Sequence, residues 1–193
     1  MVALQEADRR MGTRPAALTP EVVERETGMV PVDAGGHAAS LGWHGNAVLV
    51  SPDITVERRA ALDLPGVEPR GALILDLDGP RGELRLVAVH LGLMRRARRA
   101  QLAAIRSHLE ELDHRPTVVL GDFNEWSRHR GLEALSDFTV HTPGRTFHAA
   151  RPLAALDRIA SSAGVEMMDA GVVETQVTRV ASDHLPIWAC LQV

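Results

Sequence analysis

The sequence predicts an α/β fold, a single domain over residues 1–193 in which mixed β-sheets are layered with helices. Three observations support this prediction. The chain has 193 residues, 45% of them hydrophobic, which is enough for a sizeable core. Its apolar residues form many short runs but few amphipathic segments, and the runs between residues 45 and 91 have hairpin-like spacing. This pattern favours layered mixed sheets over a regular alternation of strand and helix.

Eight runs are predicted to be strands, because each is short, rich in Val, Leu or Ile and bounded by Gly, Pro, Asp or Ser. The last run contains Cys190, the single cysteine. An intrachain disulfide is therefore excluded, and a buried thiol is expected. In chain order the runs are Val2–Gln5, Gly45–Val50, Ala72–Leu77, Leu84–Leu91, Thr117–Leu120, Leu156–Ala160, Gly171–Val180 and Ile187–Val193.

Three segments are predicted to be helices. Apolar residues at helical spacing indicate an amphipathic helix from about Arg96 to Leu112. A shorter helix is expected near Arg128 to Leu135. Within the Gly-, Ala- and Pro-rich loop from Ala7 to Trp43, Thr19-Pro20 has the pattern of a helix start, and Gly28 has that of a helix end.

The composition limits the classes of partner. A formal net charge of -4 argues against a strongly basic, nonspecific nucleic-acid binder but does not exclude a nuclease. No apolar run approaches the roughly 20 residues of a membrane span, and the N-terminus lacks a basic region followed by an apolar one. The chain is expected to be soluble and not membrane-spanning, with no obligate protein partner. Its compartment is cytoplasmic by default, with an upstream signal peptide left open.

Carboxylates stand at the ends of four apolar, strand-like runs. The ends of strands in an α/β protein converge on one rim of the sheet, where ligands usually bind. Together the segments predict one metal-dependent phosphoesterase site. They are Leu4-Gln5-Glu6, Gly121-Asp122-Phe123-Asn124, Leu156-Asp157-Arg158-Ile159 and Ser182-Asp183-His184.

Asp122 and Asn124 stand two positions apart after a buried run, so strand geometry would place them on the same side. The carboxylate would orient water or bind a hard cation, and the amide would donate to a phosphoryl oxygen without adding charge. The alternative is an Asx-type turn, because Asp and Asn commonly close turns after strands.

Asp157 and His184 are candidates for a catalytic pair. A histidine that removes a proton from water needs a carboxylate to fix its tautomer and to stabilise the imidazolium that forms. Asp183 would have a supporting or metal-site role. The alternative for this segment is a polar turn before the last strand.

Two further residues have both a functional and an ordinary interpretation. Glu6 would be an oxygen ligand for Mg²⁺, which binds through few protein carboxylates plus water, or it would be a solvated strand end. His90 ends an apolar run and would donate to a phosphoryl oxygen, or it would be a satisfied half-buried histidine.

Arginines open the long predicted helix, at positions 95, 96, 98 and 99. They would supply cations to a phosphodiester backbone or to an anionic lipid head group, with Arg98 and Arg99 as substrate contacts. The alternative is a solvated helix face.

These segments, with Gly45-Asn46-Ala47 and Val89-His90-Leu91, resemble the motifs of the endonuclease/exonuclease/phosphatase superfamily in their order and over nearly the whole chain. That superfamily includes abasic-site endonucleases, DNase I-like nucleases, neutral sphingomyelinases and inositol phosphatases. The resemblance implies a four-layered sandwich of two mixed β-sheets flanked by helices. It also implies Mg²⁺-dependent hydrolysis of a phosphoester, with Mn²⁺ as a substitute.

The resemblance further implies a phosphodiesterase or nuclease acting on nucleic acid or on a lipid or small-molecule phosphodiester. A phosphatase or phospholipase C-like hydrolase is the first alternative, and a catalytically inactive binding module is the second. The implied roles are a Mg²⁺ ligand at Glu6, a general base or transition-state stabiliser at His184, an orienting carboxylate at Asp157, a water-positioning carboxylate at Asp122, phosphoryl contacts at Asn124 and His90, and support of the metal site or of His184 at Asp183.

The chain departs from the family pattern in two ways. Members normally begin with a strand that carries a metal-site asparagine, followed by a helix, and this unit of about 30 residues is expected to be absent, through a start codon called too late or a shortened variant. Arg158 stands where many relatives have an aromatic residue, and the chain has no tyrosine. Few aromatic contacts to a base or head group are therefore expected. Thr146-Phe147 and Leu64-Pro65-Gly66 resemble a small bacterial branch.

Overall fold

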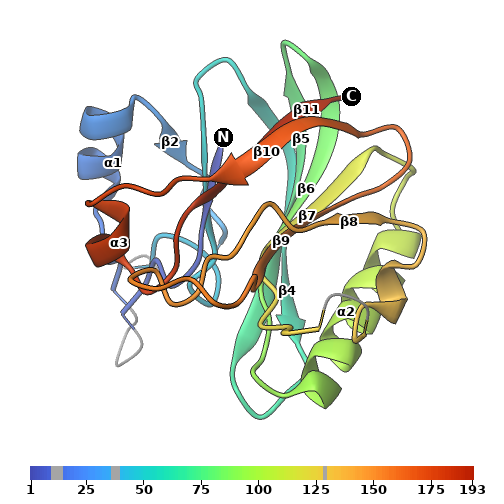
Figure 1. The fold of residues 1–193 in the computed structure, drawn as a ribbon. Helices are drawn as coiled ribbons and strands as arrows, with labels where there is room; N and C mark the ends of the chain where they lie inside the picture. Colours follow the sequence, from blue (N-terminus) through green and yellow to red (C-terminus); the bar gives the residue numbers. More distant parts are fainter. Residues whose placement is uncertain (10–14, 36–39, 128–129) are drawn as a thin grey trace.

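The structure, a computed structural model, describes residues 1–9, 15–35, 40–127 and 130–193 (Figure 1). Its largest sheet has six strands in the order β4-β5-β6-β7-β9-β8. The pair β6 and β7 is parallel, and the other neighbours are antiparallel, so the sheet is mixed. The strands are β4 (Thr55–Leu64), β5 (Arg70–Gly79), β6 (Gly82–His90), β7 (Thr117–Asp122), β8 (Thr139–His141) and β9 (Asp157–Ser161).

Two smaller antiparallel sheets lie over one face of the large sheet (Figure 1). Among the described strands, β1 pairs only with β3, and β11 pairs only with β10. The mixed large sheet and the few helices confirm the predicted α/β fold class, while the second layer, expected as another mixed sheet, is divided into two antiparallel sheets. One sheet has the order β1-β3-β2 and the other is β10-β11, with β1 (Val2–Leu4), β2 (Val30–Pro31), β3 (Ala47–Val50), β10 (Glu166–Val172) and β11 (Ile187–Gln192).

Helices flank these sheets. The long helix α2 (Arg95–Glu110) covers the face of the large sheet that points away from the small sheets, and α1 (Pro20–Thr27) packs against β2. The α1 helix begins at Thr19, whose hydroxyl accepts the N–H of Val22, and ends at Gly28, where φ is 67°. Both ends match the prediction, because the cap satisfies an orphan donor and glycine tolerates the left-handed conformation. The short elements are η1 (Glu133–Leu135) and α3 (Thr178–Ala181).

The large sheet is buried on both faces, which explains its nearly continuous apolar strands. On one face, residues such as Leu75 and Leu86 pack with Val48 of the small sheet. On the other face, residues of the same strands pack under α2, including Leu102 and Ile105 of the helix. Each face of the sheet therefore has its own core, and the strand ends between the two cores are fixed in position.

The strand β4 was not predicted, because it is an edge strand. Its residues are mostly exposed, and the run Glu57-Arg58-Arg59 interrupts its apolar positions. Edge strands commonly carry such charges because their free edge faces solvent. The three-residue β8 and two-residue β2 are too short to give a period-two pattern.

Three predictions about the chain are corrected by the structure. The strand expected over Gly171–Val180 ends at Val172, and Thr178–Ala181 is helical, since the Thr178 hydroxyl accepts the Thr175 N–H in a turn. Of the helix expected near Arg128–Leu135, positions 128 and 129 lie outside the described residues, and the rest contains only η1. Cys190 is exposed, because it lies on the outward side of β11, where exposure alternates.

Candidate active site

Three neighbouring strands place three candidate residues in one row across the large sheet. His90 at the end of β6 pairs in register with Asp122 at the end of β7. Asp122 in turn pairs with Asp157 at the start of β9. The strand ends thus converge as the sequence predicted, and residues 32 and 35 positions apart in the chain become register partners.

His184 reaches this row from the loop before β11. The loop is tied to the segment 146–154, where the Leu185 N–H donates to the Thr146 carbonyl at 3.0 Å and the Ala149 N–H donates to the Asp183 carbonyl at 2.7 Å. Phe147 forms an isolated bridge with His184. These backbone contacts fix the histidine independently of its side-chain bonds.

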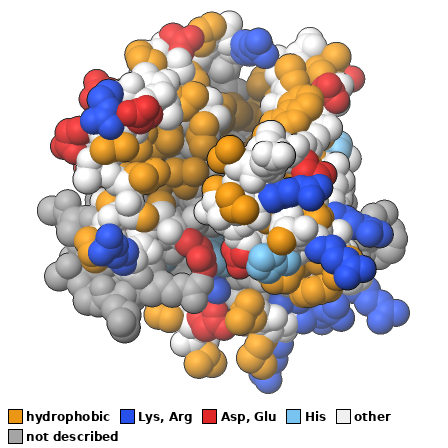
Figure 2. All heavy atoms as spheres, turned by 60° about the vertical axis from the view of Figure 1, so that its left-hand side comes forward, with side chains coloured by type: hydrophobic (Ala, Val, Ile, Leu, Met, Phe, Trp, Pro, Cys, Tyr) orange, Lys and Arg blue, Asp and Glu red, His pale blue; other side chains and the backbone are white. Residues whose placement is uncertain are grey.

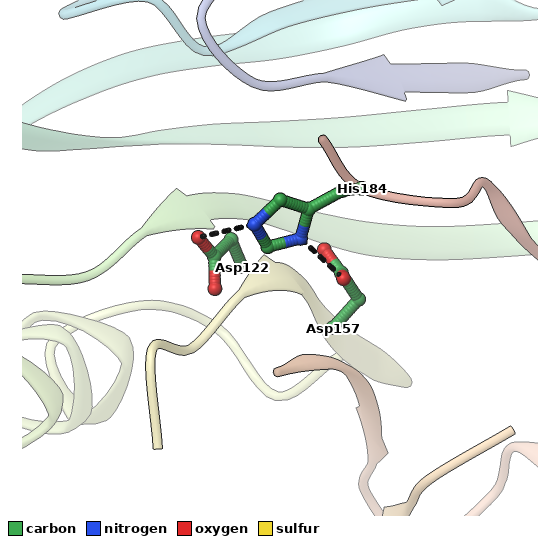
Figure 3. A group of neighbouring side chains, drawn as sticks. All are labelled: Asp122, Asp157 and His184. Atoms are coloured by element: carbon green, nitrogen blue, oxygen red, sulfur yellow. Dashed lines mark hydrogen bonds and ion pairs between the residues drawn. The ribbon is translucent and has the colours of Figure 1, made fainter. Parts of the chain in front are cut away.

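The imidazole of His184 lies between two carboxylates (Figure 3). Its Nδ1 lies 2.8 Å from Oδ2 of Asp157, and its Nε2 lies 3.9 Å from Oδ2 of Asp122. An ionised carboxylate can only accept a hydrogen bond, so Nδ1 is the donor toward Asp157. In the neutral ring this leaves Nε2 as the proton acceptor, directed toward Asp122 (Figure 3).

The charges around His184 favour its protonated form. Burial of the ring opposes the charge, but the hydrogen bond to Asp157 and the negative charges of Asp157, Asp122 and Asp183 raise its pKa to about 8. For Asp122, burial of the carboxyl group acts to raise its pKa. The hydrogen bond and charge of His90, 3.3 Å away, together with the Asn124 N–H and the charge of His184, lower that pKa overall.

The segment after β7 is both a turn and part of the site. The Asn124 N–H donates to Oδ1 of Asp122 at 2.8 Å, as in an Asx turn, and Asn124 has a φ of 51°. Its side-chain amide donates to the Leu91 carbonyl at 2.9 Å. The Asx turn, which was the alternative interpretation of this segment, is therefore present. It holds Asp122 and Asn124 in place at the site.

The row and His184 border a groove of about 1550 Å³, which we call the central groove. The edges of β1 and β11 also line it, together with Glu6 and Asp183. Figure 2 shows carboxylates and histidines close together on this side of the molecule, below a broad hydrophobic area. The sequence-predicted residues at Glu6, His90, Asp122, Asn124, Asp157, Asp183 and His184 all line this one groove.

The donor atoms in the groove suit a divalent cation. Ligand atoms of Asp122, Asp157 and His184 lie within 4.8 Å of one another, and the acidic residues Glu6 and Asp183 line the same groove. A set dominated by carboxylate oxygen matches the preference of hard cations. The Nδ1 atom of His184 is already engaged with Asp157, so oxygen atoms are the main donors on offer.

The arginines Arg98 and Arg99 do not line the groove. The Arg98 side chain is 5% exposed and ion-paired with Glu125 at 2.7 Å. Arg99 is an exposed residue that pairs with Glu133 at 3.4 Å. The structure does not bring either guanidinium to the row of His90, Asp122 and Asp157, so the substrate contacts predicted for both residues are not supported.

Sequence reasoning missed Glu125 and Trp126. Glu125 is buried among Arg95, Arg98 and the Ser127 N–H, which lower its pKa to about 2 against the raising effect of its burial. Trp126 is 66% exposed and lines the central groove. Both follow Asp122-Phe123-Asn124 directly, so proximity to that motif was the available signal.

The fold and this site together are those of a phosphoester hydrolase family. Residues 1–184 match the sequence model of the Endonuclease/Exonuclease/phosphatase family, and the chain belongs to that family. Members of the superfamily hydrolyse phosphoesters and commonly use a divalent metal. No helix in the described ranges is long and apolar enough to cross a membrane.

Known proteins extend this comparison. The uncharacterized protein YbhP of Escherichia coli strain K12 is 34% identical over 160 residues, which cover 77% of this chain and 62% of YbhP. The chain thus spans less than two thirds of that relative's length. The mannosyl-6-phosphatase Bt3783 of Bacteroides thetaiotaomicron has the same fold, with a TM-score of 0.73 at 17% identity over 90% of this chain and 80% of that one. D. rerio TDP2, complexed with a single-strand DNA product, gives a TM-score of 0.68 at 14% identity over 91% and 83%.

Proposed function

We propose that this chain is a divalent-metal-dependent phosphoester hydrolase, specifically a phosphodiesterase or nuclease, that uses water activated by His184 and Asp157. The observation that carries the proposal is the orientation of His184. Its Nδ1 is bonded to Asp157, so its Nε2 is directed toward Asp122 at the border of the central groove. In its neutral form, a histidine held in this way can act as a general base.

The proposed reaction is a displacement by water at phosphorus. The water oxygen forms a bond to phosphorus while the bond from phosphorus to the leaving oxygen breaks. The leaving oxygen takes the bonding electron pair and gains a proton from solvent water to become the alcohol. The water proton passes to Nε2 of His184, and Asp157 stabilises the imidazolium that results. Asp122 is placed to orient the water, because its Oδ2 lies 3.9 Å from that nitrogen.

His90 and Asn124 are the proposed contacts to the phosphoryl oxygens. Both border the central groove and are buried, so their donors are fixed before substrate arrives. The Asn124 amide is held through one bond to the Leu91 carbonyl, and such an amide carries a second N–H. Fixed donors at the developing negative charge lower the barrier because they need no reorganisation.

Glu6 and Asp183 are the proposed ligands of Mg²⁺, for which Mn²⁺ could substitute. Both are acidic residues that line the same groove as the row of His90, Asp122 and Asp157, and Mg²⁺ favours a few carboxylates plus water. When bound, the metal would stabilise negative charge on the phosphoryl group. Placing the metal on these residues leaves His184 available to accept the proton.

The substrate would be a phosphodiester of nucleic acid, lipid or a small molecule, and no protein partner is proposed. A phosphatase or phospholipase C-like activity would use the same residues. The relatives do not choose between these activities, since Bt3783 is a mannosyl-6-phosphatase and TDP2 was complexed with DNA.

The test is hydrolysis of bis(p-nitrophenyl) phosphate by the purified chain with Mg²⁺, compared with p-nitrophenyl phosphate, plasmid DNA and a short-chain phosphatidylcholine. We expect a rate that EDTA abolishes and that His184→Ala lowers by roughly 10²- to 10⁴-fold. Activity that survives both changes would refute the proposal. A folded chain with no activity on any substrate would instead support the binding-module alternative.

A further inference from the structure

Two aromatic rings stand beside the catalytic histidine. The Trp126 indole meets the Phe147 ring edge to face, with centroids 6.3 Å apart and an interplanar angle of 79°. The Phe147 ring in turn lies 5.1 Å from the imidazole of His184. Both aromatic residues line the central groove. An aromatic surface thus extends outward from the reacting centre, although the sequence had led us to expect few such contacts.

The backbone on both sides of Trp126 is held by buried guanidiniums. Arg158 donates to the Glu125 carbonyl at 2.5 Å and to the Ser127 carbonyl at 2.7 Å, and its side chain is among the most buried in the protein. The carboxylate of Glu125 is bonded to Arg98 at 2.7 Å. The exposed indole is therefore anchored at a defined place.

A second exposed apolar residue, from another loop, lines the central groove together with Trp126. Leu93 is 65% exposed and lines the central groove. Arg98 donates to the Leu93 carbonyl at 2.5 Å and also pairs with Glu125. One buried arginine thus joins the loop that carries Leu93 to the loop that carries Trp126, which fixes the spacing of the two exposed apolar side chains.

We infer that Trp126 selects the substrate by stacking on a flat ring, a nucleobase. This base is carried by the second alcohol of the phosphodiester, the one that is not the leaving group. The inference rests on the proposed function, because it places this ring next to the bond that His184 would cleave. Exposed tryptophan stabilises no core, whereas a pre-positioned aromatic ring binds with little loss of conformational entropy. Stacking on bases is tolerant of sequence because each base has a π-face.

The test uses three diesters that share p-nitrophenolate as the leaving group and differ only in the second alcohol: thymidine through its 5′-oxygen, methanol and octanol. We expect Trp126→Ala to lower kcat/KM for the thymidine ester by about 5- to 150-fold, the loss of one stacked base. Trp126→Phe should retain most of that rate. The methyl ester should change by less than about 3-fold, because its second alcohol carries no ring and the p-nitrophenyl ring is common to all three esters.

Trp188→Ala is the matched control, since Trp188 is a second exposed tryptophan of the groove, on β11. It should leave the ratio of thymidine to methyl rates unchanged. Equal losses on all three esters after Trp126→Ala would overturn the inference. An equal preference of the wild type for octyl and thymidine esters would also overturn it, because this part of the groove would then bind any apolar group, including a lipid chain.

A binding measurement separates this inference from the proposed function. Thymidine 5′-monophosphate is titrated into the protein while tryptophan fluorescence is recorded. We expect saturable quenching that Trp126→Ala removes and Trp188→Ala does not. If the wild type hydrolyses no ester but shows this quenching, the proposed function fails and the stacking role stands. Absence of saturable quenching in the wild type would refute the stacking role.

Discussion

Asp122 at the end of β7 and Glu125 in the segment after it are carboxylates three residues apart, and their surroundings differ. Both are buried, with side chains 8% and 1% exposed, and both have a lowered pKa. Asp122 faces two histidines at the border of the central groove. Glu125 faces two arginines. A low pKa therefore does not by itself distinguish a catalytic carboxylate from a structural one.

The difference lies in what the partner can do. Arginine stays charged and Glu125 titrates only in acid, so the Glu125 cluster keeps one protonation state near neutral pH and acts as a fixed structural support. Histidine changes charge near neutral pH, so the carboxylates around His184 stabilise a charge that can appear during a reaction. We infer that Asp122 and the histidines it faces take part in the chemistry. Glu125 and the arginines it faces support the structure.

The largest effect expected is on catalysis, from Asp157→Asn. The amide cannot stabilise the imidazolium and no longer fixes the Nδ1–H tautomer of His184, so kcat should fall by roughly 10²- to 10⁴-fold. The measurement is steady-state hydrolysis of bis(p-nitrophenyl) phosphate with Mg²⁺.

Asp63→Asn is the control for this variant, because it alters another aspartate bonded to a histidine, His44, at 3.0 Å. Asp63 is exposed and does not line the groove, so its kcat should stay near the wild-type value. If both variants lost activity equally, the special role proposed for the carboxylates around His184 would be contradicted.

The next effect is on stability, from Glu125→Gln. Removing this carboxylate leaves the buried Arg98 guanidinium without its counter-charge, and loss of one partner of a buried ion pair costs about 3–5 kcal/mol. Urea unfolding followed by circular dichroism gives the free energy. Glu133→Gln breaks the exposed pair with Arg99 and should leave the free energy of unfolding nearly unchanged, because solvent screens such a pair. Similar losses of unfolding free energy in both variants would show that Glu125 has no special structural role.

A smaller effect should appear in the pH dependence of stability, measured in EDTA. Because folding raises the pKa of His184 from 6.5 to about 8, its contribution is fully present below pH 6.5 and is lost as pH rises through 8. A shift of this size corresponds to about 2 kcal/mol. The difference in unfolding free energy between wild type and His184→Gln should therefore shrink by about that amount from pH 6 to pH 9. A difference independent of pH would contradict the environment described for His184.

Lowered pKa values act in the opposite direction. Folding lowers the pKa of Glu125 from 4.5 to about 2, so its contribution is present above pH 4.5 and is lost as pH falls toward 2. The difference in unfolding free energy between wild type and Glu125→Gln should therefore disappear in acid. The corresponding difference between wild type and His184→Gln should persist there. The two regions thus have separate pH windows in one unfolding series.

The smallest effect is expected for Arg99→Ala. Arg99 is exposed and its ion pair is long, so stability should change by less than about 1 kcal/mol and the rate of hydrolysis by less than about 2-fold. Arg98→Ala, one position earlier, is the comparison and should cost several kcal/mol, because it unpairs buried Glu125. A large loss of activity in Arg99→Ala without loss of stability would restore its predicted contact with substrate.

The sequence located the strand ends that carry the site but not the partners of the side chains. Apolar runs that end at His90 and Asp122, and one that begins beside Asp157, were visible, because buried strands leave continuous hydrophobic segments. Their common row depends on strand register, which non-local pairing decides. Arg98 illustrates the limit, since its burial follows from a partner 27 residues away. The backbone on both sides of Trp126 is held likewise by the distant Arg158.

The left-handed backbone at Asn124 bears on how this protein and its relatives could change over time. Glycine, asparagine and aspartate adopt that conformation readily, and most other residues do not. A change to glycine would therefore keep the turn and the position of Asp122 while deleting the amide. Such a sequence would fold normally and still resemble its family. The residue at this one position would then be a better guide to retained activity than similarity over the whole chain.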